Sequence, residues 1–304
     1  MPASQSHLPI LEPQARAFYC TTLSTFEKAK LDVLVGGAYA FARYTRIERH
    51  TKDFDVFVRA ADFERTLAAL DEAGYQTEIA FPHWLGKAHC GEYFVDVIYS
   101  SGNGIARVDD EWFAHATPDE VFDLPVRLCP AEEMIWSKAF VQERERFDGA
   151  DVAHLLLARA EQIDWQRLLR RFGPNWRVLL SHLVLFGFIY ASDCHRVPGW
   201  VMQDLMGRLE ASGTAPAFRS RICRGTVLSR QQYLVDVEHW GYRDARGLPD
   251  NPMTDREIET WTSGIADDGS PDTEIGQAEA KRASQQDGAI QPERPAHQQD
   301  DAYA

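Results

Sequence analysis

The sequence has few cysteines, no cysteine pattern typical of a metal site, and no hydrophobic run long enough to cross a membrane. Its five cysteines are scattered and include no Cys-x-x-Cys pair, which argues against a disulfide framework or a zinc site and favours a reducing compartment. The longest apolar run, residues 178–190, contains Ser181 and His182 and is shorter than the roughly 20 residues of a membrane span. It predicts a buried helix.

The first thirteen residues lack a basic start followed by an apolar stretch, so we expect no signal peptide. A cytoplasmic protein without disulfide partners and without membrane attachment is therefore predicted.

The chain also lacks an excess of positive charge. Its net charge of −14 argues against a general binder of nucleic acid or of anionic membranes, because such proteins usually carry a basic patch. A local basic site for a phosphate ligand remains compatible with it. Large apolar residues are almost absent from residues 264–304, so this acidic segment is predicted to be a disordered tail. Elsewhere, 44% hydrophobic residues and 8 Trp are enough for a core.

Two predicted strands carry aspartates in otherwise apolar surroundings. Residues 53–58 read Asp-Phe-Asp-Val-Phe-Val, and residues 93–99 read Tyr-Phe-Val-Asp-Val-Ile-Tyr. Because side chains alternate along a strand, Asp53 and Asp55 share one face. If the two strands are neighbours, Asp96 joins them, and three clustered carboxylates need a cation to stay ionised together. Oxygen ligands of this kind suit Mg²⁺ or Mn²⁺.

A diglycine supplies the second half of this candidate site. Gly36 and Gly37 follow the short apolar strand 31–35 and precede a helix predicted over 38–44. Glycines permit a tight turn and close approach of the backbone to a ligand, and the first N–H groups of a helix favour phosphate oxygens. Basic residues follow nearby, at Arg43, Arg46, Arg49 and Lys52.

The order of these motifs resembles the nucleotidyltransferase superfamily, which is polymerase-beta-like, and most of all its AbiEii-like and minimal nucleotidyltransferase branch. The resemblance is carried by Gly-Gly, then Thr-Lys-Asp-Phe-Asp-Val, then a third Asp in a later apolar strand. It implies that a nucleoside monophosphate is transferred from an NTP to an acceptor, with two Mg²⁺ ions held by Asp53, Asp55 and Asp96. It further implies that Gly36 and Gly37 hold the triphosphate. We assign Arg49, Thr51 and Lys52 to nucleotide binding as well.

Alternating strands and helices predict an α/β fold: a small mixed β-sheet with flanking helices, followed by a helical domain and the tail. We place the nucleotidyltransferase core at residues 1–116, the helical domain at 117–263 and the tail at 264–304. Helices are expected over residues 14–30, 61–73, 131–144, 148–160, 164–172, 175–190 and 200–209. Beyond the strands already named, strands are expected over residues 75–80, 83–89 and 126–128.

Two features of the helical domain allow more than one interpretation. Lys138 can contact a phosphate, with Asp151 orienting the lysine or a base; alternatively, residues 143–146 form only a surface of ion pairs. The segment 219–247 begins with basic residues that can dock a polyanionic acceptor. We favour a partly exposed helix whose Tyr233, Val237 and Trp240 pack on the main body.

Two other functions compete with nucleotidyl transfer. A degenerate relative would bind a nucleotide or a partner protein without catalysis, and a phosphohydrolase could use the same carboxylates. The complete set of three aspartates favours catalysis. The acceptor cannot be read from the sequence, although the negative net charge favours a small molecule or a protein over RNA.

Overall fold

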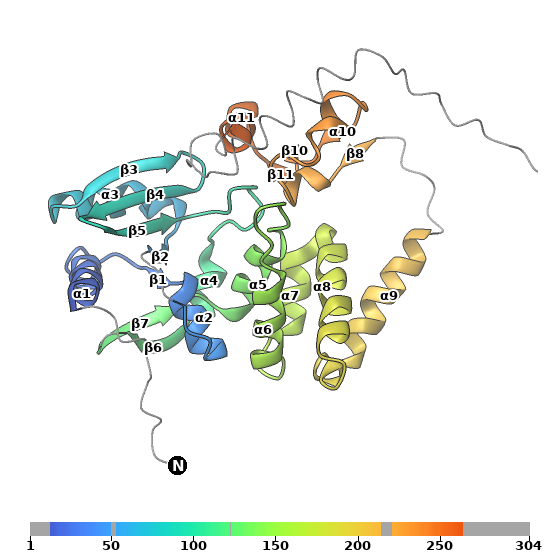
Figure 1. Ribbon diagram of the computed structural model, residues 1–304, viewed down its shortest axis with the longest axis horizontal. Helices are drawn as coiled ribbons and strands as arrows, with labels where there is room; N and C mark the ends of the chain where they lie inside the picture. The colour runs from blue at the N-terminus through green and yellow to red at the C-terminus, as the bar shows by residue number, and fades with distance from the viewer. Residues whose placement is uncertain (1–12, 50–52, 122, 214–220, 264–304) are drawn as a thin grey trace, which may run out of the picture. The chain divides into compact units, whose positions relative to one another are not determined.

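The computed structural model of the chain describes residues 13–49, 53–121, 123–213 and 221–263, and within them a mixed sheet precedes a set of helices (Figure 1). The described part up to Thr262 forms one compact unit. The tail predicted over residues 264–304 lies outside the described residues, as do Thr51 and Lys52.

The sheet has seven strands in the order β3-β4-β5-β2-β1-β7-β6, with both parallel and antiparallel neighbours. This confirms the predicted α/β fold with a mixed sheet and flanking helices. The strands are β1 (Leu34–Val35), β2 (Asp53–Phe57), β3 (Gln76–Phe81), β4 (Leu85–Cys90), β5 (Tyr93–Ile98), β6 (Thr117–Val121) and β7 (Leu124–Leu128).

The helices over Pro13–Lys28 and Phe63–Glu72 pack on the sheet. Two more helices lie between its strands in the chain, and the others follow it. The helices up to residue 213 are α1 (Pro13–Lys28), α2 (Gly37–Thr45), α3 (Phe63–Glu72), α4 (Asp110–Ala114), α5 (Ala131–Ala139), α6 (Gly149–Arg159), α7 (Trp165–Phe172), α8 (Trp176–Ile189) and α9 (Gly199–Gly213). The last segment contains β8 (Ile222–Cys223), α10 (Leu234–Glu238), β9 (Arg243–Asp244), β10 (Gly247–Leu248), β11 (Asn251–Pro252) and α11 (Asp255–Ser263).

Alternation along β2 separates a core face from a site face. Phe54 and Val56 are completely buried, and the ring of Phe54 lies 4.9 Å from that of Tyr19 on α1. Asp53 and Asp55 point to the opposite face, where they are only partly buried. Because a fully buried aromatic ring contributes a few kcal/mol of stability, the register that buries Phe54 also fixes where the two aspartates lie.

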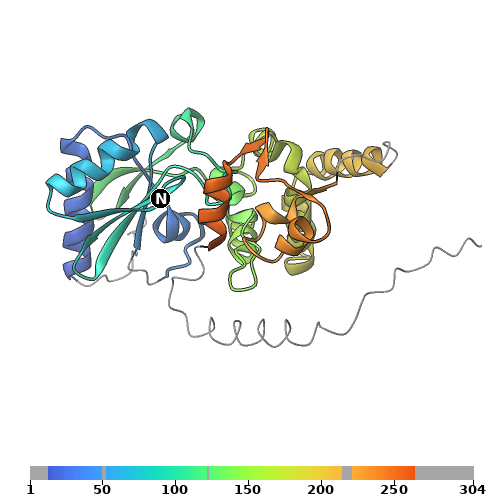
Figure 2. The same ribbon diagram turned by 90° about the horizontal axis from the view of Figure 1, so that it is seen from above.

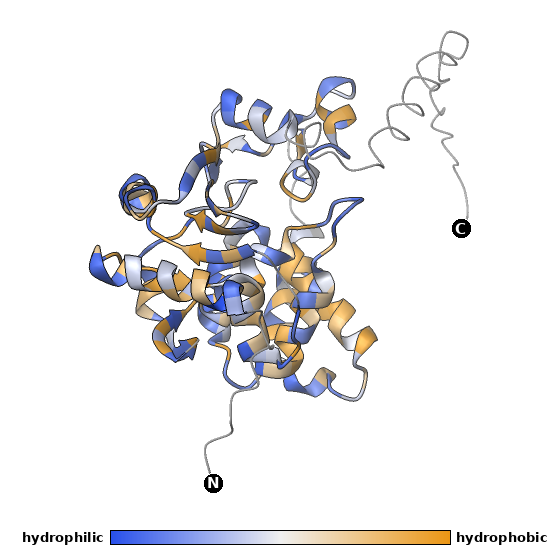
Figure 3. Ribbon diagram, turned by 60° about the vertical axis from the view of Figure 1, so that its left-hand side comes forward, coloured by the Kyte–Doolittle hydropathy of each residue, from blue (hydrophilic) through white to orange (hydrophobic). Residues whose placement is uncertain are grey.

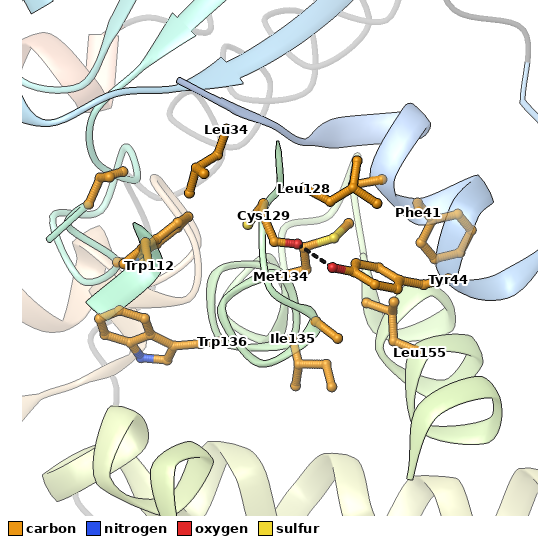
Figure 4. Packing of buried hydrophobic residues seen from close by; sticks show 14 of the residues in the cluster. Leu34, Phe41, Tyr44, Trp112, Leu128, Cys129, Met134, Ile135, Trp136 and Leu155 are labelled. Atoms are coloured by element: carbon orange, nitrogen blue, oxygen red, sulfur yellow. Dashed lines mark hydrogen bonds between the residues drawn. The ribbon is translucent and has the colours of Figure 1, made fainter. Parts of the chain in front are cut away.

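The sheet and the helices share one hydrophobic core (Figure 4). Leu34 and Leu128 from the sheet belong to the same cluster as Met134 and Ile135 from α5. The Tyr44 hydroxyl donates a hydrogen bond of 2.8 Å to the Cys129 carbonyl oxygen. This packing holds α5 against the sheet and so fixes the position of the charged residues at its end.

Four sequence-based expectations need correction. The helix predicted over 131–144 ends at Ala139, because the chain then turns back, with backbone hydrogen bonds from Glu143 N to Arg146 O and from Asp148 N to Val141 O. The apolar run 178–190 is not a buried helix, since only one face of α8 is covered and Phe188 is 85% exposed. Figure 3 shows hydrophobic residues concentrated along the helices after the sheet.

The segment 219–247 also differs from its expected packing. Trp240 is 58% exposed, so it does not pack as expected. Val237 is half-buried, and Tyr233, although 37% exposed, lies with its ring against Gly225. Finally, residues 117–121 form a strand that sequence periodicity did not indicate, since Pro118 and two acidic residues interrupt it. Strands β6 and β7 pair as an antiparallel hairpin at the edge of the sheet, so the sheet runs past residue 116. The division into domains at 116 and 263 stays a prediction.

No helix among the described residues has both the length and the apolar character that a membrane span requires.

Candidate functional site

Two adjacent parallel strands carry the three aspartates. Strand β2 pairs with β5 in parallel register, and Asp55 lies directly opposite Asp96. Neighbouring residues in register project to the same face of a sheet, so both carboxylates stand beside Asp53 on the site face. One carboxylate oxygen from each of Asp53, Asp55 and Asp96 lies within 4.8 Å of the others. The strands thus bring the three predicted ligands together.

Burial and mutual repulsion make this cluster costly for the chain alone. Burial, together with the nearby charges of Asp96 and Asp53, raises the pKa of Asp55 from 3.8 to about 7. Burial also raises the pKa of Asp96, and a hydrogen bond of 2.8 Å from Lys87 Nζ opposes this shift. A bound divalent cation would remove the repulsion, because it favours the ionised form of every carboxylate around it.

The diglycine lies against the same cluster. Gly37 has φ of +51°, and a Cβ added there would lie 1.6 Å from Asp55 Oδ2. A Cβ at Gly36 would meet the ring of Phe57 at 2.1 Å. The backbone N–H of Gly36 donates to the carbonyl oxygen of Asp55 at 2.9 Å. Only glycines therefore allow the start of α2 to approach β2 this closely, and the free N–H groups of the helix begin beside the aspartates.

Basic side chains from the part of the chain outside the two strands lie near the carboxylates. Lys138, on α5, lies with its Nζ 3.0 Å from Asp148 Oδ2 and 2.9 Å from Asp151 Oδ2. Asp151 also accepts a hydrogen bond of 2.9 Å from Arg49. Lys138 and Arg146 both act on Asp55, since their positive charges lower its pKa. Of the residues proposed for nucleotide binding, Lys138 thus lies at the cluster, while Arg49 and Asp151 hold each other beside it.

Sequence reasoning gave two residues no definite role. It placed Arg146 either in a segment near the nucleotide or in a surface ion-pair group, and the turn after α5 places its side chain at the cavity wall near Asp55. It did not single out Lys87 as a partner of Asp96, although the two residues are directly opposite in the register of β4 and β5. A predicted β4–β5 hairpin counted back from the turn at Gly91 would have revealed that second pair.

A cavity of about 240 Å³ opens beside the cluster. Its lining includes Gly37 and Asp55 together with Lys138 and Arg146. Side chains of the last segment, including Trp261 on α11, also line it. Figure 1 shows α11 above the sheet and the helices, and Figure 2, seen from above, shows it over the boundary between them.

The solved structures that the chain matches share little sequence with it. The solution structure of the antibiotic-resistance factor ANT(2'')-Ia has 16% identity and a TM-score of 0.42, over 57% of this chain and 98% of that one. The lincomycin-bound lincosamide antibiotic adenylyltransferase LnuA has 14% identity and a TM-score of 0.34, over 48% and 96%. JHP933 from Helicobacter pylori has 14% identity and a TM-score of 0.34, over 67% and 96%.

No curated protein matches the sequence. One family model does match, over residues 20–97, and its description is aminoglycoside-2''-adenylyltransferase. The matched segment contains Gly36 and Gly37 together with Asp53, Asp55 and Asp96. The part of the chain that builds the carboxylate cluster is therefore similar to a family of nucleotidyltransferases.

Proposed function

We propose that the protein is a nucleotidyltransferase that moves a nucleoside monophosphate from an NTP to a hydroxyl group of an acceptor. The observation that carries the proposal is the position of Asp53, Asp55 and Asp96 on adjacent parallel strands, directly beside the diglycine at the start of α2. The match of residues 20–97 to an adenylyltransferase family supports it and favours ATP as the donor. Membership of the AbiEii-like branch remains a prediction.

The donor set fits a hard divalent cation such as Mg²⁺ or Mn²⁺. Three carboxylates offer only oxygen ligands within reach of one another, which are the ligands that such cations prefer. When bound, a cation of this kind neutralises charge on the phosphates and makes an acceptor hydroxyl more acidic. Asp53, Asp55 and Asp96 would hold it.

The triphosphate would lie at the start of α2. The helix contributes free N–H groups and the positive end of its dipole, both of which favour phosphate oxygens. Lys138 lines the same cavity, and Asp148 and Asp151 hold its ammonium group. Because those two carboxylates fix the ammonium group, Lys138 reaches the phosphates as a positioned point charge. Asp151 therefore acts through Lys138.

The acceptor would enter on the Asp96 side. As part of the transfer, Asp96 would accept the proton of the attacking hydroxyl at a carboxylate oxygen. Lys87, 2.8 Å from Asp96, would favour the ionised form that accepts this proton. The net charge of −14 disfavours a polyanionic acceptor such as RNA, so a small molecule or a protein remains the preferred acceptor class.

Incubation with each labelled NTP, Mg²⁺ and a panel of hydroxyl-bearing acceptors tests the proposal. Pyrophosphate should be released together with a labelled product, and the Asp53→Ala, Asp55→Ala double variant should be inactive. A Glu64→Ala variant, which alters an exposed carboxylate on α3, serves as the control. Equal labelling by the double variant would refute the proposal. Metal-dependent NTP binding without pyrophosphate release would favour the degenerate relative, and release of free phosphate would favour a phosphohydrolase.

A further inference from the structure

Part of the cavity lining is aromatic. Trp84, just before β4, and Trp261, on α11, both line it. Their rings meet edge to face, with centroids 5.6 Å apart and planes at 86°. A Cβ added to Gly102 would lie 2.3 Å from the Trp261 ring, so this indole packs directly over the backbone of the loop after β5. The two rings thus form a fixed corner.

Opposite charges along the cavity are paired with each other. Arg230 Nε lies 2.8 Å from Glu143 Oε1, and the Arg230 guanidinium also covers the Trp261 ring at 4.7 Å. Asp148 is shared by Lys138 and Arg146, each at 3.0 Å. Asp55, the remaining carboxylate of the described lining, belongs to the carboxylate cluster of Asp53, Asp55 and Asp96. A ligand with several positive charges would therefore find no available anionic partner beyond that cluster.

The size of the cavity limits its occupant. Its volume of about 240 Å³ is smaller than the roughly 300–1,000 Å³ of pockets that enclose a whole drug-sized ligand. It suits one ring system attached to a group that extends outside. Gly37 and Asp55 also line it, and the proposed triphosphate lies beside them.

We propose that this compartment binds a planar, uncharged aromatic ring, and that Trp84 and Trp261 determine specificity for it. The inference rests on the proposed function, because it assumes that the triphosphate binds at the carboxylate cluster and the diglycine. The ring belongs either to the base of the NTP or to the acceptor. Because Gly37 and Asp55 line the same cavity, we expect the ring to be the base of the NTP.

Calorimetric titration of the full chain with Mg²⁺ separates the ring from the phosphates. The two ligands are α,β-methylene-ATP, which is not cleaved at its α-phosphate, and tripolyphosphate, which has no ring. Base stacking on aromatic side chains changes affinity by tenfold or more, so the wild-type protein should bind the nucleotide at least tenfold more tightly. In Trp261→Ala this difference should fall below threefold, with the affinity for tripolyphosphate unchanged. Trp240→Ala, at an exposed indole, should behave as wild type.

A second variant covers the case in which Trp261→Ala fails to fold. Leu228 is partly buried and lines the cavity, so Leu228→Trp should fill the ring compartment and cause the same selective loss. If the ring belongs to the acceptor, the wild-type protein should bind α,β-methylene-ATP and tripolyphosphate with similar affinity. Quinoline, added with Mg²⁺ and tripolyphosphate, should then bind at least tenfold more weakly to Trp261→Ala.

Two results would overturn the inference. In the first, neither variant changes the affinity for the nucleotide or for quinoline. In the second, the polycationic amino sugar kanamycin displaces the nucleotide from the wild-type protein but not from Trp261→Ala. Failure of the proposed function looks different. In that case Mg²⁺ and tripolyphosphate would bind equally well to the Asp53→Ala, Asp55→Ala double variant.

Discussion

Replacing Asp55 with asparagine should stabilise the metal-free protein. Burial and the neighbouring carboxylates raise the pKa of Asp55 from 3.8 to about 7, so the folded state holds a proton that the unfolded chain has already released. Between about pH 4 and pH 7 the unfolded state binds fewer protons, and the free energy of unfolding therefore falls as the pH rises. Above pH 7 the full cost of the buried charge is present.

The size of this effect follows from the same two pKa values. A difference between 3.8 and about 7, at roughly 1.4 kcal/mol per pH unit, gives an upper limit of about 4 kcal/mol at pH 8. Asparagine has nearly the same shape and carries no charge, so Asp55→Asn should recover a large part of it. The gain should be close to zero near pH 4, where aspartate is protonated in the folded state.

Urea unfolding in EDTA at pH 4.5, 6 and 8 measures the gain directly. Asp71→Asn, at an exposed position at the end of α3, is the matched control, and it should change the free energy of unfolding by less than about 0.5 kcal/mol. A variant that is less stable than wild type at pH 8 would refute the reasoning. So would a gain in stability that is equal at pH 4.5 and pH 8.

Three other predictions concern the same site. Mg²⁺ affinity, measured by calorimetry, should fall by about tenfold for each pH unit below 7, because the cation competes with the proton on Asp55; an affinity independent of pH would contradict this. Gly37→Ala should abolish transfer and destabilise the fold by about 1–3 kcal/mol or more, because the added Cβ would lie 1.6 Å from Asp55 Oδ2 and the backbone φ is +51°. Thermal melting and pyrophosphate release measure the two effects. Near-normal values of both would show that the diglycine is not required. Lys138→Met should raise the KM for NTP by tenfold or more and lower stability by about 1–3 kcal/mol, because Asp148 and Asp151 lose a shared partner; an unchanged KM would remove Lys138 from phosphate binding.

Local patterns in the sequence were enough to identify the three aspartates, but not to show that their strands are neighbours. Alternation places Asp53 and Asp55 on one face of β2, and the apolar residues around Asp96 identify its strand. The pairing of β2 with β5 was an assumption, because periodicity describes one strand at a time. The structure supplies the register that sets Asp55 opposite Asp96.

The cavity wall was less predictable, for a physical reason. Arg146 reaches it through a backbone turn that ends α5 at Ala139, and the sequence 140–146 contains no glycine or proline to announce that turn. Trp261 reaches it by packing over Gly102, far away in the sequence. Contacts of this kind depend on tertiary packing and leave no periodic signal.

Anomalous diffraction from crystals grown with Mn²⁺ and α,β-methylene-ATP tests the central claim most directly. We predict manganese peaks between the carboxylates of Asp53, Asp55 and Asp96, with the triphosphate against Gly36 and Gly37. Manganese bound elsewhere, with the three carboxylates contacting neither metal nor nucleotide, would contradict the account.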